Sequence, residues 1–220
     1  MEHVKGLLFD LDGVIVDTAK YHYLAWKDLA DELNIVFTEK DNERLKGVSR
    51  MKSLEIILEI GNRRMSEEDK ERYCSKKNEA YLEYIYKLKE EEVLPGVKNF
   101  LVDARRKGYK IALGSASKNA NLILSKLNLL SFFDTVIDGT KVEKAKPDPE
   151  VFLLGAEQLG VSENSCIVFE DAKAGVEAAH NGGMKAVGIG TPENLPNADL
   201  CIPGLNHICI DEIIAKLFTY

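Results

Sequence analysis

The chain has 220 residues, of which 45% are hydrophobic and 30% are charged, so it is long enough to bury a substantial core in one domain or two. Its formal net charge is -7 at pH 7, and no basic cluster is larger than residues 105–107, which argues against nucleic-acid binding. Acidic residues interrupt the apolar stretch near the N-terminus, and no apolar run is long enough to cross a bilayer. We therefore expect neither a signal peptide nor a membrane segment. The cysteines follow no zinc-site or C-x-x-C spacing, which favours reduced thiols in the cytoplasm; they are Cys74, Cys166, Cys201 and Cys209.

The first predicted element is an apolar strand over residues 4–11 that contains two carboxylates near its end. Side chains alternate along a strand, so Asp10 and Asp12 share one side of it. Two carboxylates this close repel each other, and they are tolerated when a cation neutralises one and the other carries a proton for acid chemistry. Gly13 then allows the chain to turn, although the same pattern also fits a solvated turn after a strand.

The next block, residues 18–92, shows helical patterns and no convincing strand. Apolar residues at i, i+4 spacing and capping signals predict helices over residues 18–34, 39–45, 51–60 and 66–89. This block stands between the first strand and the remaining ones, so we interpret it as an inserted α-helical cap domain. Such a cap would close over the strand ends, where ligands of open α/β sheets bind.

From Pro95 onward the pattern alternates between helix and strand. Helices are predicted over residues 97–107, 119–127, 149–160, 172–180 and from about 210, and strands over 109–113, 135–137, 166–169, 186–189 and 200–202. This alternation predicts an α/β fold, with a Rossmann-like parallel-sheet core and helices on both faces. We expect a core domain of residues 1–17 and 93–220 and a cap domain of residues 18–92.

Three further segments at strand ends carry polar residues that suit the first acidic pair. The small residues 114–119 offer backbone N–H groups and hydroxyls to phosphate oxygens, although they also suit simple helix capping. Lys146, beside a stiff proline-containing segment, presents an ammonium group at a fixed place. Glu170 and Asp171 repeat the acidic arrangement, and with Asp10 they offer an all-oxygen site to a hard cation such as Mg²⁺.

This set, in this order, resembles the four motifs of the haloacid dehalogenase superfamily of phosphotransferases. The matching residues are Asp10-Leu11-Asp12-Gly13-Val14, Ser115, Lys146-Pro147 and Glu170-Asp171. The resemblance implies that Asp10 is a nucleophile that becomes phosphorylated and that Asp12 is the general acid and base. It also implies that Ser115 and Lys146 hold the transferring phosphoryl group. The implied Mg²⁺ ligands are Asp10, Asp12, Glu170 and Asp171.

The cap segments 17–27 and 45–50 and the loop 115–119 resemble the β-phosphoglucomutases of this superfamily more than its general phosphatases. This resemblance implies interconversion of β-D-glucose 1-phosphate and glucose 6-phosphate through an aspartyl-phosphate enzyme and β-glucose 1,6-bisphosphate. Arg50 would bind the non-reacting phosphate, because a planar guanidinium grips phosphate at two points. The implied substrate-binding residues are Thr18, His22, Trp26, Lys46, Gly47, Arg50, Ser53 and Lys77 in the cap and Ser115, Ala116, Ser117, Lys118 and Asn119 in the loop.

Other interpretations stay open on the sequence alone. A sugar-phosphate or phosphoglycolate-type phosphatase would share the same core, and a non-catalytic sugar-phosphate-binding regulator would share the fold. Single basic side chains such as Arg50 and Lys118 are more often surface charges than ligands, and His22 and Trp26 are more often packing residues. We expect a monomer that binds small sugar phosphates, with neither nucleic acid nor a membrane as partner.

Overall fold

The computed structural model describes residues 4–45 and 48–218. The chain folds as two compact units. The first unit consists of Met1–Asp17 and Lys89–Tyr220, and the second, which we call the helical unit, is Thr18–Leu88.

The boundary between the units lies earlier than the sequence pattern predicts. The helical unit ends at Leu88, whereas the pattern extends the cap to residue 92. Residues 89–92 belong to the first unit because Glu90 accepts hydrogen bonds from Asn128 at 2.5 Å and from Lys98 at 3.3 Å.

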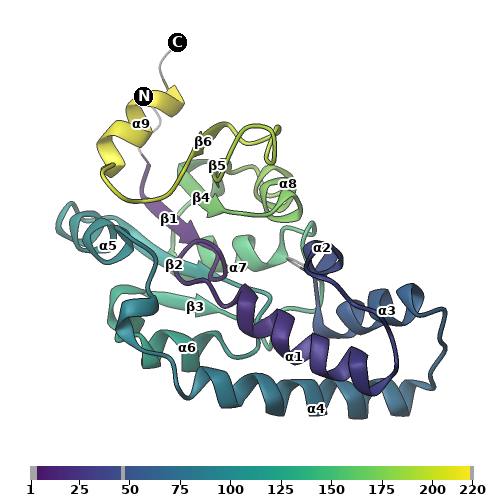
Figure 1. Cartoon of the computed structure of the whole chain (residues 1–220). Helices are drawn as coiled ribbons and strands as arrows, with labels where there is room; N and C mark the ends of the chain where they lie inside the picture. Colours follow the sequence, from purple (N-terminus) through teal and green to yellow (C-terminus); the bar gives the residue numbers. More distant parts are fainter. Residues whose placement is uncertain (1–3, 46–47, 219–220) are drawn as a thin grey trace. The chain divides into compact units, whose positions relative to one another are not determined.

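A six-stranded parallel sheet forms the first unit's framework, with strand order β3-β2-β1-β4-β5-β6 (Figure 1). Its strands are β1 (Gly6–Phe9), β2 (Lys110–Gly114), β3 (Thr135–Ile137), β4 (Cys166–Glu170), β5 (Lys185–Ile189) and β6 (Leu200–Ile202). The order reverses direction at β1, because β2 lies on one side of it and β4 on the other. The predicted α/β fold is confirmed, and the strands lie close to their predicted positions.

Helices cover both faces of this sheet. They are α5 (Val97–Arg106), α6 (Ala120–Lys126), α7 (Glu150–Leu159), α8 (Lys173–Asn181) and α9 (Ile210–Phe218), with short 3₁₀ helices η2 (Glu90–Glu92), η3 (Leu130–Phe132) and η4 (Glu163–Ser165). One face carries Leu8 and Val168, which share an apolar cluster with residues of α7 and α8. The alternate residues Phe9 and Phe169 stack with ring centroids 4.6 Å apart, and Phe100 of α5 meets both rings edge-on. The sheet is therefore buried on both sides, as its continuous apolar strands predict.

The helical unit contains no strand among its described residues. Its helices are α1 (Ala19–Glu32), α2 (Glu39–Asn42), η1 (Glu43–Leu45), α3 (Arg50–Ile60) and α4 (Glu67–Ile85). Trp26, Phe37, Leu54 and Ile57 are buried in one apolar cluster, which holds these helices together. This agrees with the predicted all-helical block.

The last helix of this unit, α4, ends at Ile85 rather than at the predicted residue 89. The amides of Lys87 and Leu88 bond to carbonyls three residues back, those of Tyr84 and Ile85. These bonds tighten the chain into a 3₁₀ turn, which ends the α-helix.

Among the described residues, no helix combines the length and the apolar character that crossing a bilayer requires. All four cysteines are free thiols. Burial raises the pKa of the Cys166 thiol to about 12, so this residue is an unreactive part of the core.

Candidate active site

Neighbouring strands of the sheet bring polar residues to one edge. β1 lies between β2 and β4, and Phe9 is aligned with Leu113 and with Phe169. Asp10 follows β1 directly, and its N–H donates to the Phe169 carbonyl at 2.9 Å. Glu170 is the last residue of β4. Since the carboxyl ends of parallel strands meet at the same edge, Asp10 and Glu170 lie together there.

A buried lysine joins these two carboxylates. Lys146 Nζ lies 2.5 Å from Asp10 Oδ1 and 2.6 Å from Glu170 Oε1. It also donates to the Gly114 carbonyl at 3.1 Å, so each of the three ammonium hydrogens has an acceptor. The side chains of Lys146 and Glu170 are only 2% and 1% exposed. We call Asp10, Lys146 and Glu170 the acidic cluster.

The charges of the acidic cluster do not cancel. Burial alone would lower the pKa of Lys146, but the carboxylates of Asp10 and Glu170 raise it above its ordinary value, so the ammonium stays charged. Burial and then the Asp10 charge raise the pKa of Glu170, and Lys146 opposes this shift. One ammonium faces two carboxylates, which leaves negative charge that a cation would offset.

Two more acidic residues lie beside this cluster, Asp12 in the turn after β1 and Asp171 directly after β4. The Asp12 N–H donates to Asp10 Oδ2 at 3.0 Å. Gly13 has a φ of +79°, and a Cβ there would lie 2.2 Å from Asp171 Oδ2. Asp171 therefore packs directly on the Asp10 to Gly13 turn, and only glycine leaves room for it.

The donors in this part of the molecule are oxygens, which suits a hard divalent cation. Both oxygens of Glu170 are already engaged, one by Lys146 and the other by the Ala172 N–H at 2.9 Å. Within the described residues, no three His, Cys, Asp or Glu side chains are gathered as a metal site, so the four predicted carboxylate ligands are not brought together as one. Mg²⁺ typically uses only one or two protein carboxylates together with water and substrate phosphate, so the chemistry of this donor set fits it.

Helix α8 approaches Glu170 closely. A Cβ on Gly175 would lie 1.8 Å from Glu170 Oε1, which is a steric overlap. The absence of a side chain at Gly175 is thus what allows Glu170 to reach Lys146.

The loop that follows β2 is shaped by its own serines. Ser115 Oγ accepts the N–H of Ser117 at 3.1 Å, and Ser117 Oγ accepts the N–H of Asn119 at 3.2 Å. Ser115 is buried, whereas Lys118 is exposed. A hydroxyl that accepts one hydrogen bond can still donate its proton, so this geometry is compatible with both helix capping and phosphate binding.

In the helical unit, a second lysine is buried among aromatic rings. Lys77 Nζ lies 2.7 Å from His22 Nδ1, 4.9 Å from the centroid of the Trp26 ring and 4.6 Å from that of Tyr81. The rings of His22 and Tyr81 stack at 4.1 Å, and the Tyr81 hydroxyl donates to Thr18 Oγ1 at 3.2 Å. An ammonium only donates, so His22 Nδ1 is the acceptor and its ring proton is on Nε2.

The electrostatic environment of His22 is positive. Burial of its ring, followed by the charges of Lys77 and Arg50, lowers the pKa of His22 well below its ordinary value of 6.5. His22 is therefore neutral near pH 7. We call His22, Arg50 and Lys77 the basic cluster.

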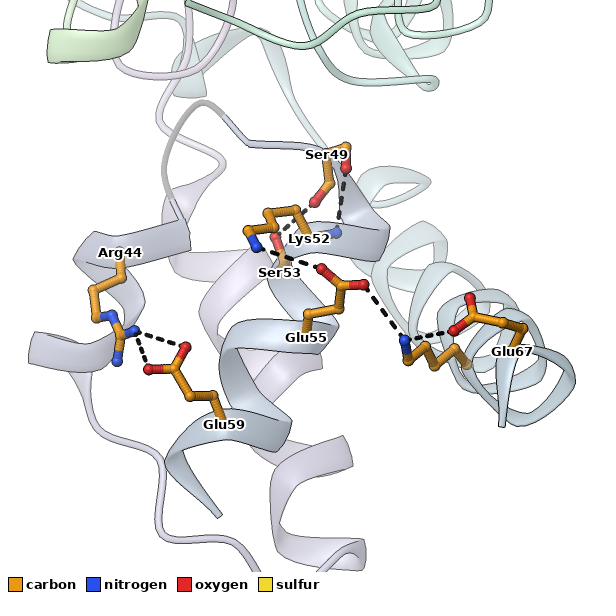
Figure 2. Close-up of polar contacts among 8 residues, drawn as sticks. Arg44, Ser49, Lys52, Ser53, Glu55, Glu59 and Glu67 are labelled. Atoms are coloured by element: carbon orange, nitrogen blue, oxygen red, sulfur yellow. Dashed lines mark hydrogen bonds and ion pairs between the residues drawn. The ribbon is translucent and has the colours of Figure 1, made fainter. Parts of the chain in front are cut away.

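Arg50 is the first residue of α3, and local hydrogen bonds fix the start of this helix. Ser49 Oγ accepts the Lys52 N–H at 3.2 Å, and Ser53 Oγ donates to the Ser49 carbonyl at 3.1 Å (Figure 2). Arg50 Nη2 donates to Asn78 Oδ1 of α4 at 2.8 Å. Burial lowers the pKa of the Arg50 guanidinium.

The structure thus brings the predicted residues together in two groups. In the first unit, Asp10, Asp12, Lys146, Glu170 and Asp171 are neighbours, and Ser115, Ala116, Ser117, Lys118 and Asn119 form one loop. In the helical unit, Thr18, His22 and Lys77 contact Tyr81, and the Lys77 ammonium also lies over the Trp26 ring, while Arg50 and Ser53 lie on α3. Trp26 is part of the apolar cluster, as the packing interpretation predicts. Lys46 and Gly47 lie outside the described residues.

The sequence pattern does not predict the contacts of three further residues beside these groups. Tyr81 stacks on His22, Asn78 bonds to Arg50, and Gly175 leaves space for Glu170. The contacts of Tyr81 and Asn78 join different helices, so no spacing in the sequence reveals them. A glycine in the first turn of a predicted helix was the one signal available for Gly175.

Comparisons with known proteins agree with the geometry. A family model described as "Haloacid dehalogenase-like hydrolase" matches residues 7–189. A Bacillus subtilis protein named "Beta-phosphoglucomutase" is 43% identical over 210 residues, covering 94% of this chain and 93% of that protein. A crystal structure of beta-phosphoglucomutase from Clostridium difficile is 42% identical, with a TM-score of 0.94 over 97% of both chains. A Thermotoga maritima protein named "Phosphorylated carbohydrates phosphatase" is 33% identical over 187 residues, covering 84% of each chain.

Proposed function

The chain belongs to the haloacid dehalogenase-like hydrolase family, and we propose that it is a phosphomutase that interconverts β-D-glucose 1-phosphate and glucose 6-phosphate. The observation that carries this proposal is the similarity to beta-phosphoglucomutases, which extends over nearly the whole chain and therefore includes the helical unit. A shared catalytic core alone would fit many phosphatases equally well.

We propose Asp10 as the nucleophile. One carboxylate oxygen attacks phosphorus, an acyl phosphate forms, and the bond between phosphorus and the sugar oxygen breaks. Asp12 donates a proton to that leaving oxygen and later removes one from the hydroxyl that accepts the phosphoryl group. The Asp12 N–H and Lys146 hold the two oxygens of Asp10, which supports this role by fixing the carboxylate.

The complete reaction uses this step twice. Phosphorylated Asp10 gives its phosphoryl group to the 6-hydroxyl of β-glucose 1-phosphate, and β-glucose 1,6-bisphosphate results. After the bisphosphate turns over, Asp10 takes the 1-phosphate and glucose 6-phosphate leaves. Both phosphates must therefore fit both the reacting site and a second anion site.

We propose that Ser115 and Lys146 stabilise the phosphoryl group as it moves, because a hydroxyl and a charged ammonium stand at the same sheet edge as Asp10. Bound Mg²⁺ would offset the charge of the carboxylate and the phosphoryl group, and Asp10 and Asp171 are the residues that would hold it. Glu170 then acts mainly by fixing Lys146, since both of its oxygens are engaged.

We assign the second anion site to Arg50 with Ser117, Lys118 and Asn119. The sugar pocket is assigned to Lys46, Gly47 and Trp26, with Ser53 near it, and the remaining proposed substrate-binding residues of the helical unit are Thr18, His22 and Lys77. The positive character of the basic cluster supports this assignment, because phosphate is an anion. We further propose that the protein acts as a cytoplasmic monomer, and the free cysteines are compatible with a reducing compartment.

A coupled assay tests the proposal. Purified protein with Mg²⁺, β-glucose 1-phosphate and a small amount of glucose 1,6-bisphosphate should produce glucose 6-phosphate, detected through its dehydrogenase. Release of inorganic phosphate at a comparable rate would reject the mutase.

The alternative is a sugar-phosphate phosphatase, which the Thermotoga maritima relative favours. Arg50→Ala separates the two functions, since a mutase needs the second anion site and a phosphatase of small substrates does not. A mutase should lose activity about 100-fold or more, as expected when a charged hydrogen-bonding group is removed.

A further inference from the structure

Arg50 differs from its basic neighbours in the kind of group that holds it. Arg44 pairs with Glu59 at 3.3 Å, and Lys52 pairs with Glu55 at 3.5 Å (Figure 2). Lys70 also pairs with Glu55, at 3.4 Å. Arg50, by contrast, donates to a neutral amide, Asn78 Oδ1, at 2.8 Å. Among the described residues of the helical unit, no carboxylate lies within ion-pair distance of Arg50.

The charged side chain described near Arg50 is another cation. Lys77 is buried with its Nζ 2.7 Å from His22 Nδ1, and the charges of Lys77 and Arg50 both act on the neutral His22 ring. Arg50 is also the first residue of α3, where the helix dipole adds partial positive charge. Arg50 is half-buried, and a partly buried cation without a carboxylate among the described residues of its unit suits a place where an anionic ligand supplies the balancing charge.

The side chain of Arg50 is nevertheless fixed. One Nη2 hydrogen bond goes to Asn78, and the Arg50 carbonyl accepts the Cys74 Sγ–H at 3.8 Å. Cys74 and Asn78 stand one turn apart on α4, so this helix holds both the backbone and the guanidinium of Arg50. Among the described residues no other hydrogen bond engages the guanidinium, so its remaining N–H groups can bind phosphate at two points.

We propose that Asn78 is a positioning residue that orients Arg50 toward a phosphate group and leaves its positive charge intact. The inference rests on the proposed function in one respect, namely that Arg50 binds the non-reacting phosphate. The neutrality of residue 78 is its essential property. An aspartate has nearly the same shape, but it would form an ion pair with Arg50 and compete with the phosphate.

The test compares Asn78→Asp and Asn78→Ala, with Glu79→Ala as a control on the exposed side of the same helix. Asn78→Ala should raise the KM for β-glucose 1-phosphate about tenfold, because a hydrogen bond to a charged group is lost. Asn78→Asp should raise the KM further while its melting temperature stays at or above that of Asn78→Ala. Asn78→Asp would then bind the substrate more weakly than Asn78→Ala although it is at least as stable.

A purely structural role gives the reverse result. If Asn78 only packs α4 against α3, the isosteric Asn78→Asp should keep both stability and KM better than Asn78→Ala. That outcome, or an unchanged KM in both variants, overturns the proposal.

Calorimetric binding of glucose 6-phosphate separates this inference from the proposed function. If the wild type binds glucose 6-phosphate but shows no mutase turnover, the proposed function fails, and Asn78→Asp must still weaken binding more than Asn78→Ala. If the wild type is an active mutase and the variants bind normally, only the inference about Asn78 fails. A wild type that neither binds nor turns over sugar phosphate overturns both.

Discussion

The acidic cluster and the basic cluster surround their cationic side chains with different kinds of group. In the first unit, Lys146 lies between two carboxylates, and every hydrogen of its ammonium has an acceptor. In the helical unit, Lys77 Nζ contacts the His22 imidazole, and Arg50 donates to the Asn78 amide. The first arrangement places two carboxylates around one ammonium and suits a further cation, whereas the second brings two cationic side chains to bear on a neutral ring and suits an anion. The two clusters therefore favour ligand groups of opposite charge.

Asp10→Asn should produce the largest effect, because it removes the proposed nucleophile from the acidic cluster. We expect mutase turnover to fall about 10⁴-fold or more, since an amide does not replace a carboxylate as nucleophile. Incubation with glucose 1,6-bisphosphate and Mg²⁺ should add a phosphoryl mass to the wild type and none to the variant, measured by mass spectrometry.

The matched control is Asp31→Asn, which removes an exposed carboxylate that pairs with Lys27 on α1. It should keep wild-type turnover. A wild type that never becomes phosphorylated at Asp10 would instead support the non-catalytic regulator.

Lys146→Met should be the next largest change, because it leaves two buried carboxylates without their cation. We expect turnover to fall about 10³-fold and unfolding free energy to fall by about 3–5 kcal/mol. Turnover in the coupled assay and urea unfolding measure the two effects.

The double variant Lys146→Met with Glu170→Gln tests the charge balance of the acidic cluster more directly. The second substitution removes one unpaired charge, so it should restore part of the stability and none of the activity. Lys144→Met, at an exposed lysine in the same loop, is the control and should leave both quantities unchanged. Equal stability of Lys146→Met and wild type would contradict the charge balance described for the acidic cluster.

Gly175→Ala should have an intermediate effect that acts through geometry rather than charge. The new Cβ would overlap the Glu170 carboxylate, 1.8 Å away in the present arrangement, so Glu170 must move from Lys146. We expect kcat to fall about 10-fold to 100-fold, as positioning of catalytic groups is lost, with a smaller change in KM. Gly204→Ala is the control, because a Cβ there would meet no described atom within 4 Å. Similar kcat values in the two variants would argue against the role of Glu170 in fixing Lys146.

The sequence reveals the acidic cluster better than the basic one, for a physical reason. Asp10 and Glu170 stand at the ends of apolar strands, and a parallel sheet gathers such ends at one edge, so local patterns are enough to predict that they meet. The pairing of Arg50 with Asn78 joins residues 28 apart on two helices, and helical periodicity gives the face of each helix but not which faces meet. Likewise, residues 89–92 follow a helical pattern and yet join the first unit, because contacts of Glu90 with distant residues decide their place.

The smallest predicted effect concerns the pH dependence of the basic cluster. The pKa of His22 is lowered in the folded protein, first by burial and then by Lys77 and Arg50, whereas the unfolded chain takes up the proton near the ordinary 6.5. Below about pH 6.5 the unfolded state therefore binds more protons, and the stability that neutral His22 contributes is lost as pH falls. The unfolding free energy should drop by up to about 1.4 kcal/mol per pH unit in this window through His22 alone.

His22→Gln should remove this part of the pH dependence of the unfolding free energy. The control His207→Asn, at an exposed left-handed position with φ of 59°, should keep it. Urea unfolding at several pH values between about 5.5 and 8 measures the slope, and equal slopes for wild type and His22→Gln would show that the basic cluster accommodates a proton without cost.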